Sequence, residues 1–176
     1  MIEVKDDELY FAKIKENAII PTKRVEDAGY DAYACFDGDY LVIDPFTTKG
    51  IPTGIATAFS DNYYIQVEER GSTAKIGMKK SAGVIDSGYR GEYIIMLYNA
   101  NAKPIIISKV SDVPNKISYE GKEYAAEDCI VYPASKAICQ LILHEVPKVQ
   151  SKEISYEELC QITSERGAGG WGSSKK

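Results

Sequence analysis

Short apolar stretches rich in β-branched residues and tyrosine recur along this chain, and turn-forming residues interrupt each of them. The 176 residues include 13 tyrosines, 14 glycines and 7 prolines. Ile, Val, Thr and Tyr favour extended backbone, whereas Gly, Pro, Asp and Asn favour turns. The sequence therefore predicts an all-β fold made of short strands.

The expected elements follow from this alternation of apolar runs and turns. Strands are expected at Tyr40–Ile43, Gly54–Phe59, Tyr63–Val67, Tyr93–Tyr98, Ile105–Ile107, Ile130–Tyr132 and Ile138–Val146. Two short helices are expected, at Ser72–Met78 and Ser155–Leu159. A chain of this length suits one compact domain, which we assign to residues 1–163, followed by an arm over residues 164–176.

The charge pattern limits the classes of ligand. The formal net charge is −5, and the basic residues are scattered among acidic ones. Extended nucleic-acid binding needs a stripe or patch of Lys and Arg along the polymer. We therefore expect no nucleic-acid polymer as a partner, while a small anion such as a nucleotide remains compatible with the sequence.

The cysteines and the amino terminus bear on location. Cys35, Cys129, Cys139 and Cys160 form no C-x-x-C pair, so neither a zinc site nor a disulfide framework is indicated. Met1–Tyr10 lacks the apolar core of a signal peptide, and no apolar run approaches the roughly 20 residues that span a bilayer. We expect a cytoplasmic protein with no membrane partner.

The segment Gly83–Glu92 places a carboxylate where an apolar run meets a turn. One interpretation is that Asp86 caps the turn by bonding to the backbone two residues on. The other is that Asp86 acts as a general base for a water molecule, with Tyr89 as an aromatic plate against a sugar.

The segment Arg70–Ala74 combines a guanidinium, a glycine and two hydroxyls ahead of an expected helical turn. Arg matches phosphate oxygens in a bidentate fork, and free N–H groups at a helix start also favour anions. A triphosphate could bind there. The alternative is an ordinary helix cap, with Ser72 bonded to its own helix and Arg70 in solvent.

The last residues, from Ser164 onward, are too rich in glycine to pack as a helix or strand on their own. Their composition is typical of a disordered end. The same segment contains Arg166 and Trp171 among small residues, a mixture suited to closing over a phosphorylated ring compound.

Five short motifs in order resemble those of the trimeric dUTP pyrophosphatase (dUTPase) family. They are Ala28–Asp31, Arg70–Ala74, Gly83–Glu92, Ile138–Ile142 and Arg166–Ser174. The resemblance implies a distorted jelly-roll subunit and an enzyme that hydrolyses dUTP to dUMP and pyrophosphate. It also implies a homotrimer whose three sites lie between subunits, each closed by the glycine-rich arm of a neighbour.

The same resemblance implies a role for each matched residue. Asp86 would activate the attacking water, and Tyr89 would pack under the deoxyribose. The remaining substrate-binding residues would be Ala82, Gly83 and Val84 at the uracil edge, Arg70, Gly71, Ser72 and Gln140 at the phosphates, and Arg166, Gly170, Trp171, Gly172 and Ser173 in the arm. Mg²⁺ would be held by the substrate phosphates without direct protein ligands, with Asp31 as indirect support.

The chain also departs from the family pattern. The second motif reads Arg-Gly-Ser where Arg-Ser-Gly or Arg-Ser-Ser is commoner, Gly88 replaces an Asp in the third motif, and Ser135-Lys136-Ala137 replaces the Gly-Asp-Arg turn before the fourth. About 40 residues separate Asn99 from Gln140, which suggests an inserted hairpin or small lobe at about residues 109–128. Insertions of this kind occur in some phage and bacterial relatives, and a phage member would act in the host cytoplasm.

Two other functions fit parts of the same pattern. The first is a dCTP deaminase, which shares the phosphate and sugar motifs, but its catalytic Glu would fall at Met96, and methionine cannot transfer protons. The second is a regulatory protein that senses a nucleotide and binds a protein partner through the insertion. Product analysis with dUTP and dCTP distinguishes the three functions.

Overall fold

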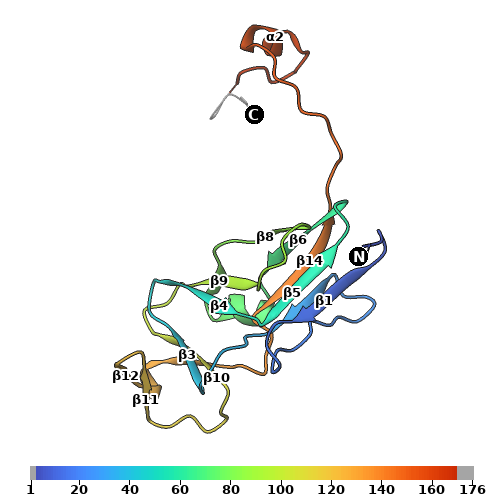
Figure 1. Cartoon of the computed structure of the whole chain (residues 1–176). Helices are drawn as coiled ribbons and strands as arrows, with labels where there is room; N and C mark the ends of the chain where they lie inside the picture. The colour runs from blue at the N-terminus through green and yellow to red at the C-terminus, as the bar shows by residue number, and fades with distance from the viewer. Residues whose placement is uncertain (1–2, 170–176) are drawn as a thin grey trace. The chain divides into compact units, whose positions relative to one another are not determined.

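The structure is a computed structural model that describes residues 3–169, and most of its regular elements are strands. The chain divides into two compact units, Met1–Val146 and Pro147–Lys176. The first unit contains β1 (Leu9–Lys13), β2 (Gly29–Ala32), β3 (Tyr40–Ile43), β4 (Thr48–Pro52), β5 (Ile55–Phe59), β6 (Tyr63–Glu68), α1 (Gly71–Lys75), β7 (Met78–Lys80), β8 (Val84–Asp86), β9 (Ile94–Asn99), β10 (Ile105–Ser108), β11 (Lys116–Tyr119), β12 (Lys122–Ala125), the 3-10 turn η1 (Ala126–Asp128), β13 (Ile130–Pro133) and β14 (Cys139–Glu145) (Figure 1). The prediction of an all-β fold is confirmed.

The seven expected strands exist, with ends that differ by a residue or so. The helix expected at Ser72–Met78 was partly wrong, because α1 ends at Lys75 and Met78 begins β7. Gly77 has a φ of +69°, a conformation that ends a helix and that L side chains rarely adopt. Beyond it, Met78 is fully buried in the core as the first residue of a strand.

A four-stranded antiparallel sheet in the order β2-β14-β6-β8 carries several of the candidate site residues. Gln140 on β14 lies opposite Asp31 on β2 and Glu68 on β6, while Asp86 on β8 lies opposite Tyr64 on β6. Directly paired residues share a face of a sheet, and so do residues two apart along a strand. The side chains of Asp31, Gln140 and Asp86 therefore emerge on the same face.

The opposite face of this sheet packs into the main core. Ile65, Val67 and Leu141 are almost completely buried there, with more aliphatic side chains from the other sheets around them. Apolar and polar residues alternate along β6 and β14 because one face of the sheet packs into the core and the other carries polar side chains.

The hairpin β11–β12 lies in the segment where extra length was expected, and it covers a second, smaller core. Strand β10 is buried along its whole length: Ile105 and Ile107 face the main core, while Ile106 packs with Val42 and Ile117 under the hairpin. The hairpin thus shields a strand face that would otherwise be exposed. It lies at the end of this unit away from β8 (Figure 1).

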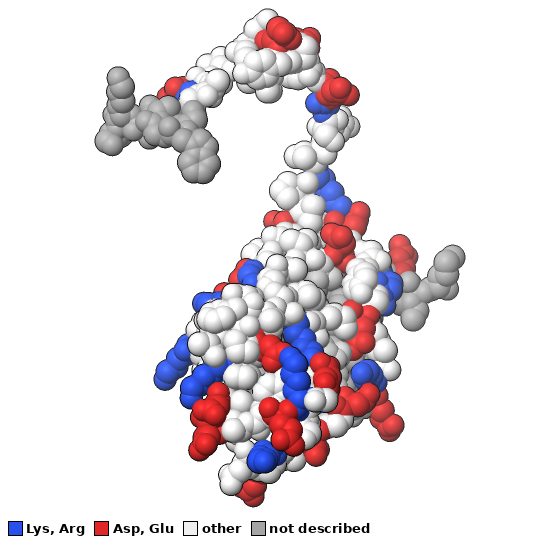
Figure 2. All heavy atoms as spheres, turned by 90° about the vertical axis from the view of Figure 1, so that its left-hand side faces the viewer, with Lys and Arg blue, Asp and Glu red and all other residues white. Residues whose placement is uncertain are grey.

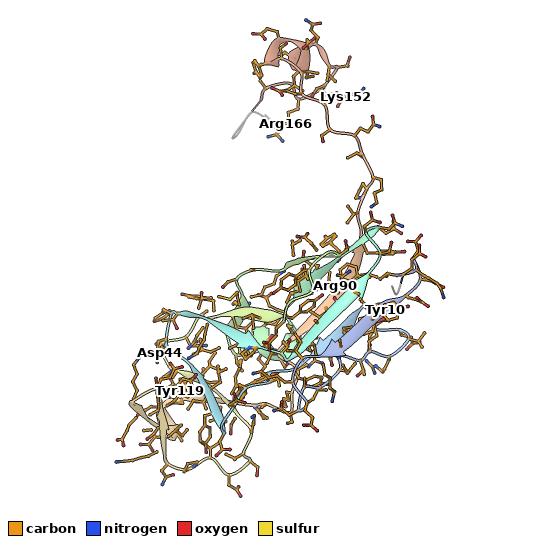
Figure 3. All side chains as sticks on the ribbon, viewed as in Figure 1. Tyr10, Asp44, Arg90, Tyr119, Lys152 and Arg166 are labelled. Atoms are coloured by element: carbon orange, nitrogen blue, oxygen red, sulfur yellow. The ribbon has the colours of Figure 1, made fainter. Side chains whose placement is uncertain are left out.

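Charged contacts fasten the hairpin to the turn after β3. Lys122 forms an ion pair of 2.6 Å with Asp44, and the Tyr124 hydroxyl donates to the same carboxylate at 2.9 Å. Lys49 pairs with Glu120 at 3.0 Å and lies 4.5 Å from the centre of the Tyr119 ring. Figure 3 shows Asp44 and Tyr119 close together at this junction. The hydrogen bond from Lys122 holds the pKa of Asp44 below its usual value.

Between Pro147 and residue 169, the second unit contains one short helix, α2 (Tyr156–Gln161). Its start is fixed by a capping box, in which the Glu158 N–H donates to the Ser155 hydroxyl at 3.1 Å and the Ser155 N–H donates to Glu158 at 2.8 Å. The expected helix at Ser155–Leu159 was therefore placed correctly but is shifted toward Gln161. Arg166 closes a local turn by donating from Nε to the Gly169 carbonyl at 2.8 Å.

Charges of both signs interleave on the face of the Met1–Val146 unit that Figure 2 shows. This face therefore offers a polymeric anion no continuous basic surface. Among residues 3–169, no helix is long and apolar enough to cross a membrane.

Candidate active site

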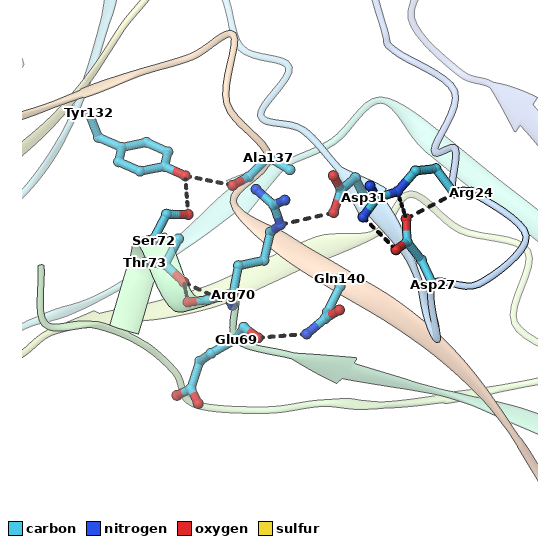
Figure 4. Close-up of polar contacts among 10 residues, drawn as sticks. All are labelled: Arg24, Asp27, Asp31, Glu69, Arg70, Ser72, Thr73, Tyr132, Ala137 and Gln140. Carbon is cyan, nitrogen blue, oxygen red and sulfur yellow. Dashed lines mark hydrogen bonds and ion pairs between the residues drawn. The ribbon is translucent and has the colours of Figure 1, made fainter. Parts of the chain in front are cut away.

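Arg70, Asp31 and Gln140 meet where β2, β14 and the end of β6 lie side by side (Figure 4). Arg70 Nε donates to the Asp31 carboxylate at 2.9 Å, and the two side chains are each about one-third exposed. Gln140 Nε2 donates to the carbonyl oxygen of Glu69 at 2.9 Å. The first, second and fourth motifs are thus brought together by strand pairing.

Two polar hollows open around this cluster and share Arg70 and Gln140. The smaller, of about 310 Å³, is lined by Arg70, Gly71, Ser72 and Gln140. The larger, of about 660 Å³, adds residues ahead of and within β2: Thr22, Lys23, Arg24, Glu26, Asp27, Ala28, Gly29 and Asp31. Cationic and amide donors therefore face a space large enough for a phosphate chain.

Sequence reasoning missed Arg24 and Asp27 at the rim of the larger hollow. Arg24 donates to Asp27 from both Nε and Nη2, at 2.9 and 2.8 Å, and this bonding lowers the pKa of Asp27 to about 2. The only available signal was an Arg and an Asp three residues apart just before the first motif. The pair fixes the loop that leads into β2.

The start of α1 differs from the ordinary cap considered above. The residue before the helix is Arg70, whose N–H donates to the Thr73 hydroxyl at 3.1 Å, while that hydroxyl donates to the Arg70 carbonyl at 2.9 Å. Ser72 does not cap its helix; its hydroxyl lies 3.3 Å from the Tyr132 hydroxyl. Arg70 is ion-paired with Asp31 and is not free in solvent.

Cys139 lies behind the Asp31–Arg70 pair, at the start of β14. The thiol is buried, and burial raises its pKa to about 12. It therefore stays protonated at neutral pH and offers no thiolate nucleophile.

Asp86 is the last residue of β8 and is exposed. The N–H of Tyr89 donates to the Asp86 main-chain carbonyl at 3.1 Å, which closes the turn. Within the described part of the chain, the Asp86 carboxylate makes no hydrogen bond to a neighbouring residue and so does not cap that turn. A carboxylate left free at the end of an edge strand is available to bind or deprotonate a water molecule.

Strand β8 lies at the edge of its sheet, so half of its backbone groups face outward. The Gly83 carbonyl accepts from the Val67 N–H at 2.7 Å, which marks this residue pair as hydrogen-bonded. Pairs alternate along an antiparallel ladder, so the N–H and C=O of Val84 point away from β6. They offer one donor and one acceptor side by side at the free edge.

Tyr89 covers a hollow of about 270 Å³ beside this edge, which is lined by Val84, Ile85, Asp86, Tyr89, Glu92, Tyr93 and Ile94. The Tyr89 hydroxyl donates to the Glu92 carbonyl at 3.0 Å, and its ring stacks on Tyr93 at 6.2 Å between centroids. A Cβ at Gly91 would collide with the Tyr89 ring. Glycine at 91 therefore permits the ring to fold over the hollow.

The two clusters do not meet within one copy of the chain. Asp86 pairs with Tyr64 and Gln140 pairs with Glu68, so their partners on β6 are four residues apart. In addition, β8 and β14 lie on opposite sides of β6. Strand geometry gives about 13 Å along the sheet and about 10 Å across it, or about 16 Å between the two backbone positions.

The other candidate residues have mixed outcomes. Ala82 lies in the turn between β7 and β8, next to Gly83. Arg166 lies in the second unit. Gly170, Trp171, Gly172 and Ser173 lie outside the described residues. In the described range, no group of three or more His, Cys, Asp or Glu residues could hold a metal ion.

Comparison with known proteins gives a consistent result. A family model described as dUTPase matches residues 15–113. The deoxyuridine 5'-triphosphate nucleotidohydrolase of Debaryomyces hansenii is 34% identical over 164 residues, which cover 92% of this chain and 83% of that protein.

Two solved structures share the fold. The Staphylococcus bacteriophage 80alpha dUTPase with dUPNHPP matches with a TM-score of 0.71 and 21% identity, over 97% of this chain and 99% of that one. A mutant dUTPase from phage phi11 of S. aureus, described with a structural Mg(II) ion, matches with a TM-score of 0.62 and 20% identity, over 84% and 97% of the two chains. The prediction of a dUTPase-like jelly roll is confirmed, and this chain belongs to the dUTPase family.

Proposed function

We propose that this chain hydrolyses dUTP to dUMP and pyrophosphate by attack of an Asp86-activated water on the α-phosphorus. The observation that carries the proposal is the free Asp86 carboxylate, which stands at the lip of an aromatic hollow and beside an unpaired strand edge. Family membership gives the substrate class. The cluster of Arg70 and Gln140 is assigned to the phosphate end of the substrate, and the cluster of Asp86, Val84 and Tyr89 to its base and sugar.

The strand edge suits the uracil base. Uracil offers the N3–H donor next to carbonyl acceptors, which complements the C=O and N–H of Val84. Cytosine has an acceptor at N3 and an amino group at C4, so both contacts would be mismatched. A site built on hydrogen bonds rejects such analogues strongly.

The Tyr89 ring suits the sugar. It is 47% exposed and held from behind by Tyr93, so one of its sides is open to the hollow. A deoxyribose packed against the ring leaves no room for a 2′-hydroxyl. Tyr89 therefore accounts for a preference for deoxyribonucleotides.

Arg70 and Gln140 are assigned to the phosphate chain. Arg70 is already held in place by Asp31, so little side-chain entropy is lost when a phosphate binds. Gly71 lets the substrate approach the backbone closely, since a Cβ there would meet open space only. The proposed role of the arm residues Arg166, Gly170, Trp171, Gly172 and Ser173 is to close over the bound nucleotide.

Mg²⁺ fits this arrangement as a partner of the substrate. Bound to the triphosphate, it would neutralise negative charge and favour departure of pyrophosphate. The larger hollow contains carboxylates at Glu26, Asp27 and Asp31 that can accept hydrogen bonds from metal-bound water. Asp31 is the one that also touches Arg70, which makes it the proposed indirect support.

A complete site requires more than one copy of the chain. A general base must reach its water within about 3 Å, directly or through one further water. The separation between the Asp86 and Gln140 positions in one copy is several times larger, so Asp86 serves a phosphate chain held by a neighbouring copy. We propose a homotrimer with three shared sites, acting in the cytoplasm.

Product analysis with three nucleotides tests the proposal. With Mg²⁺, dUTP should give dUMP and pyrophosphate, while dCTP should release no ammonia and UTP should react at least about a hundredfold more slowly in kcat/KM. Tyr89→Ala should raise the UTP rate relative to dUTP, whereas the matched Tyr89→Phe should keep the discrimination. Ammonia from dCTP, or equal rates for UTP and dUTP, would contradict the assignment.

A further inference from the structure

The hydroxyl of Tyr132 connects the two segments that carry the phosphate donors. Tyr132 lies on β13 and is 4% exposed. Its hydroxyl donates to the Ala137 carbonyl at 2.7 Å and lies 3.3 Å from the Ser72 hydroxyl (Figure 4). Ala137 leads into the strand that carries Gln140, and Ser72 follows Arg70 by two residues. One buried hydroxyl therefore bridges the second motif and the residue just before the fourth.

The direction of these hydrogen bonds is determined by chemistry. A carbonyl oxygen only accepts, and tyrosine has a single hydroxyl hydrogen, so that hydrogen is used on Ala137. At the remaining contact Ser72 must then be the donor. The hydrogen of the Ser72 hydroxyl is thus used on Tyr132.

We propose that Tyr132 is a positioning residue, and that the Ser72 hydroxyl is a tether to it and not a phosphate donor. The inference rests on the proposed phosphate-binding role of Arg70 and Gln140. The Gln140 amide bonds to the Glu69 carbonyl, and the Tyr132 tether holds the same two segments a few residues further along. Together the two contacts set the spacing between the Arg70 and Gln140 side chains.

A mutant cycle tests the tether. The kcat/KM for dUTP is measured for Tyr132→Phe, Ser72→Ala and the double variant. Each single change should lower kcat/KM about five- to tenfold, and the double variant should match Tyr132→Phe within about twofold, because Tyr132→Phe already removes the contact that Ser72→Ala removes. A Ser72→Ala loss of about a hundredfold or more, multiplicative losses, or unchanged single variants would each overturn the proposal.

Binding measurements separate positioning from general loss of structure. Tyr132→Phe should weaken binding of the analogue dUPNHPP by a similar factor and leave binding of deoxyuridine unchanged, since only the phosphates depend on the tether. Equal weakening of both ligands would contradict the proposal. Tyr124→Phe is the matched control: it removes a hydroxyl that binds Asp44 in the hairpin and should leave kcat/KM unchanged.

The wild-type protein provides a test that does not depend on the stability of a variant. In a crystal structure with dUPNHPP and Mg²⁺, the Ser72 oxygen should remain in hydrogen-bond contact with Tyr132. A Ser72 hydroxyl turned onto a phosphate oxygen would overturn the tether while leaving the proposed function intact. A wild-type protein that does not hydrolyse dUTP would instead contradict the proposed function and, with it, this inference.

Discussion

The chemistry proposed for this chain depends on a few side chains that the fold leaves available. Asp86 is exposed and makes no hydrogen bond to another described residue, whereas Asp31 and Asp27 are both engaged by arginine. Bonding to Arg24 lowers the pKa of Asp27 to about 2, and the Asp31 carboxylate is occupied by Arg70. Among these three aspartates, Asp86 is therefore the one whose carboxylate is open to a water molecule.

Replacing this base tests its role. Asp86→Asn should lower kcat for dUTP at least about a hundredfold, because the amide keeps the shape of the side chain but is not basic. The dissociation constant of dUPNHPP should change little. Steady-state kinetics and calorimetric titration measure the two effects, and the exposed Asp37→Asn serves as a control. Near-normal turnover in the folded variant would mean that another group activates the water.

Residue positions were predictable to the extent that they depend on local sequence. Asp86 at the end of a strand and Arg70 ahead of a helical turn could be read from neighbouring residues. The Arg70–Asp31 ion pair and the Tyr132 contact join residues that are far apart in the chain, and only the strand pairing brings them together. No local pattern marked Tyr132, which is one of 13 tyrosines.

At the scale of elements, the strands that could be predicted are those with several aliphatic residues in a row. Strand β10 is an unbroken Ile-Ile-Ile run and was expected, because both of its faces are buried. The apolar run that ends at Asp86 was expected and forms the short edge strand β8, whereas β7, which contains two lysines, was missed, as were β1, β2 and β4. Helix α1 was expected to be longer, since no local rule assigned Met78 to the core.

The hairpin β11–β12 is best described as structural support for β3 and β10. The ion pair with Asp44 holds the hairpin in place, and the pKa of Asp44 is lowered in the folded protein. The ion pair therefore stabilises the fold above about pH 4, the ordinary pKa of Asp. This stabilisation is lost as the pH falls through the lower pKa of the folded state. The Asp44 side chain is 36% exposed, so the contribution is small, at most about 1 kcal/mol.

This description gives a prediction for Asp44→Asn. At pH 7 the amides of β11 and β12 should exchange with deuterium faster than in the wild-type protein, while kcat/KM for dUTP stays within about twofold. Below about pH 4 the difference in exchange should shrink, because the wild-type carboxylate is then protonated too. Asp112→Asn, at an exposed position in the same segment, is the control. A large loss of activity would contradict a purely supporting role.

At the scale of the whole molecule, the distance between the Arg70–Gln140 cluster and the Asp86–Tyr89 cluster is the basis of the proposed assembly. The strand order puts the Asp86 edge and the Gln140 end of one sheet about 16 Å apart. In the proposed assembly, a single copy contributes half of one site and half of another. The all-β class and the jelly roll followed from composition and motif order, but this separation required the strand register.

Mixing two inactive variants tests shared assembly most directly. Asp86→Asn and Arg70→Ala proteins should each be nearly inactive with dUTP. When equal amounts are unfolded and refolded together, a site takes an intact Asp86 and an intact Arg70 from different copies with a probability of about one quarter. The mixture should therefore recover about a quarter of the wild-type activity per site. A mixture that remains as inactive as its parents, despite verified exchange of subunits, would contradict the shared site and favour one contained within each copy.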